Sequence, residues 1–169
     1  GYICVSRPRR FGKSMAANML TAYYSRGCDS RGLFQGLKIA THPDFEKHLN
    51  QYNVIHLNMR DYLTESENMK QLIQFVEDDL LDELQQEFSD LRMPRRKTLV
   101  KVLEQAFVQY KIPFVFIIDE WDCIFRVHKS DAVSQKEYLD FLRNLLKDKS
   151  YIALAYMTGI LPIKKYGEH

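Results

Sequence analysis

An unbroken apolar run, Pro113-Phe114-Val115-Phe116-Ile117-Ile118, constrains the fold of this chain more than any other segment. A strand without polar positions is typical of a parallel sheet that helices cover on both faces. Three more segments indicate strands, at residues 2–5, 54–59 and 151–157. Apolar residues at helical spacing predict helices over residues 13–25, 72–88, 99–110 and 134–145. This alternation predicts an α/β fold with a mostly parallel sheet and right-handed crossovers.

Two capping boxes predict where helices begin. Thr64 with Glu67 is expected to start the long helix, and Ser134 with Glu137 the helix after the apolar run. Pro94 is expected to separate the long helix from the next one, because proline breaks a helical pattern.

The composition fits a single domain over residues 1–169, with 46% hydrophobic and 27% charged residues. A net charge of +2 gives no whole-chain case for a nucleic-acid protein. Because no apolar run reaches the roughly 18 residues of a membrane span, we expect no membrane partner. Three cysteines (Cys4, Cys28 and Cys123) are too sparse for a disulfide framework, which favours a reducing, cytoplasmic setting. Without a starting methionine, the chain is expected to be a fragment of a longer protein, truncated at its C-terminus.

A phosphate-binding loop is indicated by Phe11-Gly12-Lys13-Ser14, which follows the first predicted strand and opens a helix. This is the tail of the P-loop pattern G-x-x-x-x-G-K-[ST], with Arg7 at the first glycine position. Backbone N–H groups near Gly12 can surround phosphate oxygens, and Lys13 offers a cation to the β- and γ-phosphates. The helix N-terminus favours anions. The alternative is a chance G-K-S at a helix start. The predicted nucleotide-binding residues of this loop are Arg9, Arg10, Phe11, Gly12, Lys13, Ser14 and Met15.

A pair of acids, Asp119 and Glu120, directly follows the apolar run. In an ATPase site, the first acid holds the Mg²⁺ shell and the second polarises the attacking water. The alternative is that both simply begin a solvated loop. Ligands of open α/β sheets bind at the carboxyl ends of strands, where the loop and the acids are both expected to lie. The two motifs together therefore favour a P-loop NTPase-type three-layer sandwich.

Four segments together resemble the prokaryotic AAA-ATPase-like family over residues 2–165. They are Arg7-Pro8-Arg9-Arg10-Phe11-Gly12-Lys13-Ser14, Leu33-Phe34-x-Gly36-Leu37-x-Ile39, Ile118-Asp119-Glu120-x-Asp122 and Thr158-Gly159. In that family an arginine is usual at the first glycine position. The resemblance implies a P-loop ATPase core that binds ATP with Mg²⁺. Gly12, Lys13 and Ser14 are then the end of Walker A, and Asp119 and Glu120 are the Walker B pair. It also implies that Thr158 closes the sensor strand.

The predicted function is ATP hydrolysis, with Lys13 and Glu120 as catalytic residues and Ser14 and Asp119 as ligands of Mg²⁺. For Thr158 two interpretations stay open: it senses the γ-phosphate, or it is only a turn residue at the end of the strand. The family implies two further partners: an appended PD-(D/E)XK-nuclease-like domain outside this chain, and a neighbouring subunit supplying a cationic finger. One alternative function is a nucleotide-dependent binding switch with little or no hydrolysis.

Another alternative is a nucleic-acid-associated module that uses a basic cluster, which we interpret instead as a solvated loop. This cluster comprises Arg92, Arg95, Arg96 and Lys97. Asp122 stays open between a supporting role near the site and a surface acid. We expect Trp121 to pack beside the site, and we interpret His56 and His128 as strand and loop residues rather than ligands.

Overall fold

The structure is a computed structural model that describes residues 13–161, with side chains described from Ala16 onward. The predicted strand over residues 2–5 therefore lies outside the described residues, as do four predicted site residues, Arg9, Arg10, Phe11 and Gly12.

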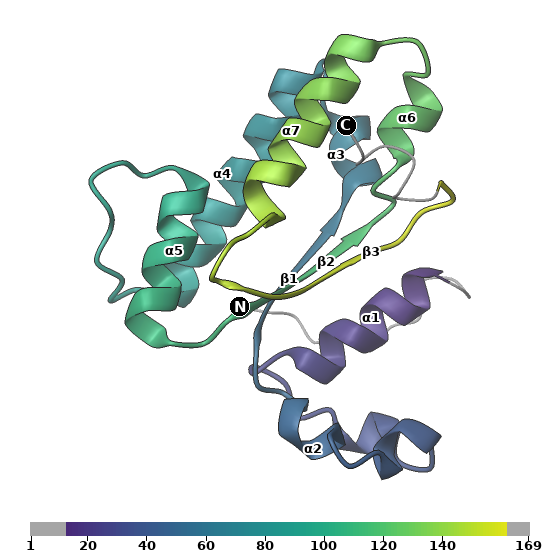
Figure 1. The fold of residues 1–169 in the computed structure, drawn as a ribbon, viewed down its shortest axis with the longest axis vertical. Helices are drawn as coiled ribbons and strands as arrows, with labels where there is room; N and C mark the ends of the chain where they lie inside the picture. Colours follow the sequence, from purple (N-terminus) through teal and green to yellow (C-terminus); the bar gives the residue numbers. More distant parts are fainter. Residues whose placement is uncertain (1–12, 162–169) are drawn as a thin grey trace.

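The sheet of the described residues has three parallel strands in the order β1-β2-β3. These are β1 (Asn53–Asn58), β2 (Phe114–Asp119) and β3 (Ile152–Met157). All six residues of the central strand β2 are buried, as its apolar run predicted. The α/β class and the parallel sheet are thus confirmed, and the architecture is consistent with a P-loop-type sandwich (Figure 1).

Helices cover the two faces of the sheet unequally. One face carries α1 (Lys13–Tyr24) and, beyond it, the short helices η1 (Arg31–Phe34), η2 (Lys38–Thr41) and α2 (Phe45–His48) (Figure 1). The other face carries most of the helical residues. They form α3 (Met59–Glu65), α4 (Met69–Glu87), α5 (Leu99–Tyr110), α6 (Cys123–Val127) and α7 (Ala132–Leu146).

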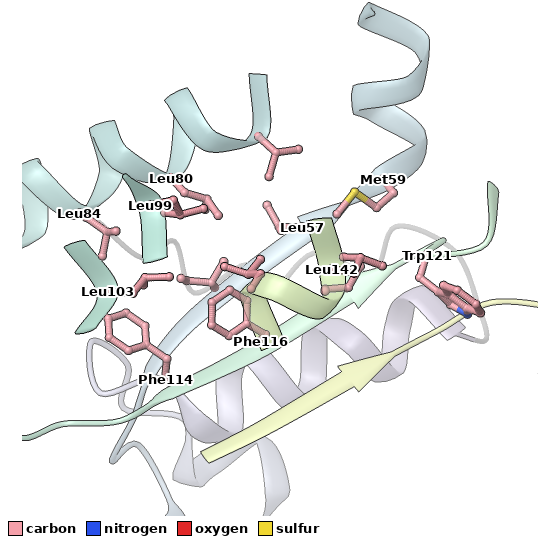
Figure 2. Packing of buried hydrophobic residues seen from close by; sticks show 14 of the residues in the cluster. Leu57, Met59, Leu80, Leu84, Leu99, Leu103, Phe114, Phe116, Trp121 and Leu142 are labelled. Carbon is pink, nitrogen blue, oxygen red and sulfur yellow. The ribbon is translucent and has the colours of Figure 1, made fainter. Parts of the chain in front are cut away.

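Alternate side chains of β2 are divided between these two faces, because successive residues of a strand point in opposite directions. Phe114, Phe116 and Ile118 join the larger core cluster with leucines of α4, α5 and α7 (Figure 2). Val115 and Ile117 join a smaller cluster with Ala17 of α1. The face to which each side chain of the strand points can therefore be read from its position.

Both predicted capping boxes are wrong. Thr64 lies inside α3, and α4 begins one residue after Asn68, whose side chain accepts a hydrogen bond from the Gln71 backbone N–H at 2.8 Å. At the start of α7, Asp131 accepts from the Ser134 N–H at 3.0 Å. In each case an Asn or Asp directly before the first residue of the helix is the N-cap, since these residue types are strongly preferred there.

The expectations about a membrane span and about the cysteines can be compared with the structure. None of the helices within residues 13–161 has the length and apolar character needed to cross a bilayer. Cys123 is a free, buried thiol, and burial raises its pKa to about 11. Cys28 is disulfide-bonded.

Candidate functional site at the carboxyl edge of the sheet

Helix α1 runs antiparallel to the strands, with its N-terminus toward their carboxyl ends. At the other end of the helix, the Tyr52 N–H donates to the Tyr24 carbonyl at 2.9 Å. Closer to the N-terminus of α1, the Thr21 hydroxyl lies 3.3 Å from His56 Nδ1 of β1. From Thr21 back to Lys13 the helix extends about 12 Å, whereas β1 continues only about 7 Å beyond His56. Lys13, the first residue of α1, therefore lies at the carboxyl edge (Figure 1).

Asp119 and Thr158 meet at this edge, on the face that carries α1. Each continues the alternation of its strand, after Ile117 on β2 and after Tyr156 on β3, and both of those residues pack in the α1 cluster. The Thr158 hydroxyl donates to Asp119 Oδ1, and only 4% of Asp119 and 6% of Thr158 is exposed. The two residues predicted for Walker B and the sensor strand are thus in direct contact.

Glu120 follows Asp119 with a left-handed backbone, at φ 55°. Its N–H lies 3.1 Å from Asp119 Oδ1 and 3.4 Å from the Thr158 hydroxyl oxygen. Its carboxylate accepts a hydrogen bond from Arg126 Nη2, and Arg60 Nε lies 3.8 Å from the same oxygen, Oε2. Asp119 and Glu120 are therefore adjacent in sequence but have different partners.

Asp122 is a fully buried acid that anchors the segment after β3. Its Oδ2 accepts hydrogen bonds from the backbone N–H groups of Ile160 and Leu161, both at 2.8 Å. Burial favours a higher pKa, but these two donors and the Arg126 guanidinium outweigh it, and the pKa of Asp122 is lowered. The surface-acid alternative is therefore wrong, and Asp122 supports the loop that follows Thr158.

Trp121 packs beside the site, as expected. Only 2% of it is exposed (Figure 2). Its ring lies 5.7 Å from that of Phe125, centroid to centroid. The Tyr138 hydroxyl donates to the Trp121 carbonyl at 2.6 Å. A hydrogen bond from α7 thus holds the backbone between Glu120 and Asp122.

His56, which we interpreted as a strand residue, lies on β1 and also contributes to the electrostatics of this edge. Desolvation lowers the pKa of His56, and the nearby Asp119 carboxylate opposes that shift. His128 is the residue that ends α6, in agreement with its interpretation as a loop residue.

Two cations of the site, Arg60 and Arg126, were missed by the sequence analysis. Arg126 stands four residues after Asp122, a spacing at which opposite charges pair on a helix, and the two groups lie 3.3 Å apart. That spacing was the available signal for Arg126. Arg60 comes from α3, far away in the sequence, and no local pattern connects it to Glu120.

The basic cluster is not brought to this site. Its residues belong to the loop between α4 and α5, which lies beyond the opposite end of the sheet (Figure 1). The arginines and the lysine of the cluster are exposed, in agreement with their interpretation as a solvated loop. An open apolar groove of about 540 Å³ lies along α1, η2 and α2, and Asp119, Glu120 and Thr158 do not line it.

Among the described residues, no group of three or more His, Cys, Asp or Glu side chains is arranged to hold a metal ion. The backbone of Ser14, the other predicted ligand of Mg²⁺, is part of α1, and its side chain lies outside the described part of the chain. Of the two residues predicted to bind Mg²⁺, Asp119 is the one whose side chain the structure describes.

The open parallel sheet, with a helix beginning where its strands end, places the chain in the α/β class and is consistent with a P-loop-type sandwich. A family model described as a predicted AAA-ATPase matches residues 1–167. The chain therefore belongs to this AAA-ATPase-like family, and the family name indicates nucleotide binding and ATPase activity. No curated protein and no solved structure gives a significant match.

Proposed function

We propose that this chain binds ATP with Mg²⁺ at the carboxyl edge of its sheet and hydrolyses it. The observation that carries the proposal is the convergence of two motifs at that edge. Helix α1 begins there at Lys13, and Asp119 meets Thr158 there on the face of α1. Membership of a predicted ATPase family supports the same activity. The proposed location is cytoplasmic, because the reaction needs a compartment that supplies ATP.

The phosphates are proposed to bind at the start of α1. The unpaired N–H groups and the dipole of a helix N-terminus attract anions, and Lys13 adds a full positive charge. Ser14 and Asp119 offer a hydroxyl and a carboxylate, and hard oxygen donors of this kind suit Mg²⁺. When bound, Mg²⁺ neutralises charge on the phosphates.

Glu120 is proposed to orient and deprotonate the attacking water. A carboxylate that follows the metal-binding acid is well placed for this role, and a positioned base of this kind contributes about 10²–10⁴-fold to a rate. Thr158 is proposed to link the γ-phosphate to this pair, because its hydroxyl contacts Asp119 Oδ1 and lies near the Glu120 N–H.

A second candidate function, the nucleotide-dependent binding switch, is favoured by one observation. The Glu120 carboxylate is engaged by Arg126 and Arg60 rather than standing alone in the site. If the Glu120 carboxylate stays paired with these arginines, it does not activate water, so the site binds ATP without hydrolysing it.

Glu120→Gln separates the two functions. For hydrolysis, we expect the wild-type chain to release phosphate from ATP with Mg²⁺, and Glu120→Gln to lower kcat by about 10²–10⁴-fold while ATP binding is retained. Phosphate release and ATP binding are measured on the same preparations, with GTP as the competing nucleotide. Binding of ATP without turnover by the wild-type chain contradicts hydrolysis and favours the switch.

A further inference from the structure

Positive charge is concentrated in one stretch of this chain. Between Asp90 and Glu104 the sequence holds the four residues of the basic cluster and Lys101, and it holds no acid. This stretch carries a charge of +5, whereas the whole chain carries +2, so the rest of the chain is net negative. The near-balance of the whole chain therefore conceals a strong local field, and such a field attracts anionic partners.

The basic cluster takes part in none of the ion pairs within residues 13–161. Lys101, by contrast, pairs with Glu104 at 3.4 Å. All four side chains of the basic cluster are exposed. Exposure agrees with the interpretation of the segment as a solvated loop, and it also leaves four charges open to a partner. The ion pairs of the described residues use other cations, namely Arg26, Arg31, Arg60, Lys101, Arg126, Lys136 and Arg143.

Hydrogen bonds hold both ends of the loop that carries the cluster. The Gln109 side chain donates to the Asp90 carbonyl and accepts from the Arg92 N–H, both at 2.9 Å. At the other end, the Thr98 hydroxyl caps α5 by accepting from the Lys101 N–H at 3.4 Å. The cations are therefore carried by a backbone that needs little further ordering when a partner binds, which favours affinity.

The loop runs the length of α5, on the side of that helix away from the sheet (Figure 1). Arg92 is held beside Gln109, near the end of α5, and Lys97 directly precedes the N-cap Thr98. From Thr98 to Gln109 the helix rises about 16 Å. Because each strand of a duplex presents a phosphate about every 3.4 Å of its axis, the cluster spans roughly five phosphates.

The residue types of the loop fit phosphates rather than bases. Three of the four cations are arginines, which bind phosphate oxygens through two parallel hydrogen bonds. Residues 89–98 include no aromatic side chain on which an unpaired base could stack. Met93 packs against the larger core cluster and Pro94 is half-buried. The loop therefore suits the continuous backbone of a duplex better than the exposed bases of a single strand.

The same surface lacks the apolar face that membrane binding needs. Proteins that lie on a membrane combine cations with an apolar face that enters the lipid. Within the loop and α5, all of which the structure describes, Val108 is the one large apolar residue that is exposed. A single exposed apolar side chain is ordinary on a protein surface. Nucleic acid is thus favoured over an anionic membrane.

From these observations we infer that the basic cluster binds the phosphate backbone of duplex nucleic acid, without regard to base sequence. DNA and RNA duplexes share this chemistry. The inference goes beyond the proposed function, because the loop lies beyond the opposite end of the sheet from Lys13 and Asp119 (Figure 1). The two ends of the sheet then serve two different anions, a nucleotide and a polymer.

The test is the binding of a short labelled DNA duplex of mixed sequence to the whole chain, followed by fluorescence anisotropy at several salt concentrations. One phosphate contact for each cation predicts a slope of about −3.6 for log K against log salt, or roughly a 100-fold loss of affinity between about 50 and 200 mM. Removing two contacts, by Arg95→Gln with Arg96→Gln, should reduce the slope to about −1.8.

Lys38→Gln with Lys47→Gln is the matched control. It removes the same net charge from exposed lysines of η2 and α2, which lie on the other face of the sheet (Figure 1). The slope and the Kd should stay those of the wild type. An equal loss of binding in the control and in the double arginine variant overturns the inference, because binding would then follow net charge alone.

Gln109→Ala tests the held backbone, since it keeps all four charges of the cluster. We expect the salt slope of the wild type with a Kd about two- to ten-fold weaker, because the loop must then be ordered on binding. A wild-type Kd in this variant overturns the preformed site.

Three further arms separate the possible partners. An RNA duplex of the same sequence that binds as the DNA duplex does, or more tightly, supports the same phosphate site. Tighter binding of a single strand of equal length overturns the inference, as does binding to phosphatidylserine vesicles that the duplex does not displace. Absence of duplex binding at low salt also overturns it. Because no ATP is added, a failure of the proposed function leaves these results unchanged.

Discussion

Three acids within four positions, Asp119, Glu120 and Asp122, have three different surroundings. Asp119 contacts the hydroxyl of Thr158, Glu120 contacts two arginines, and Asp122 is buried under two backbone N–H groups. The left-handed turn at Glu120 and the start of α6 after Asp122 produce this divergence. At the scale of residues, the function of each carboxylate therefore follows from its partners rather than from its type.

Gly159 is the residue at which a single methyl group should disturb this arrangement. A Cβ there would lie 2.6 Å from Asp122 Oδ1 and 2.8 Å from Trp121 Cδ1, closer than such atoms approach. Because both neighbours are buried, we expect Gly159→Ala to lower the free energy of unfolding by about 1–3 kcal/mol, measured by urea denaturation. Gly32→Ala is the control, since a Cβ at Gly32 meets nothing within 4 Å. Equal stability of the two variants would refute the close packing at Gly159.

At the scale of elements, the sequence predicted what depends on local periodicity. The apolar run became β2, and the repeat of apolar residues became α4 and α5, because burial of one face fixes such segments. The short helices α3 and α6 were not predicted, since five to seven residues carry too little periodicity and depend on tertiary contacts. Arg60 reaches Glu120 from α3, so the missed helix explains the missed cation.

The start of α7 gives a test at this scale. Asp131 accepts hydrogen bonds from the N–H and the hydroxyl of Ser134, at 3.0 and 2.8 Å. Asp131→Ala should therefore lower the free energy of unfolding by about 1 kcal/mol, the usual cost of losing an N-cap. Glu137→Ala removes the acid of the predicted capping box and should have almost no effect. A larger loss of stability in Glu137→Ala than in Asp131→Ala, in thermal or urea unfolding, would support the capping box instead.

At the scale of the whole molecule, the sheet brings together residues that are distant in the sequence. Its parallel order places the ends of β2 and β3 side by side, so that Thr158 reaches Asp119. The direction of α1 then brings Lys13 to the same edge. The motifs predicted that these residues serve one site, whereas strand register and the orientation of Glu120 depend on long-range packing that no local pattern encodes.

The account depends most on nucleotide binding between the start of α1 and Asp119. The direct measurement is the Kd for ATP with Mg²⁺ of the wild-type chain, of Lys13→Ala and of the surface control Lys129→Ala, each checked for retained secondary structure. Loss of a charge-assisted contact to phosphate should weaken binding about ten- to hundred-fold in Lys13→Ala, and Lys129→Ala should bind as the wild type does. Equal affinity of the Lys13→Ala and wild-type chains would contradict the account.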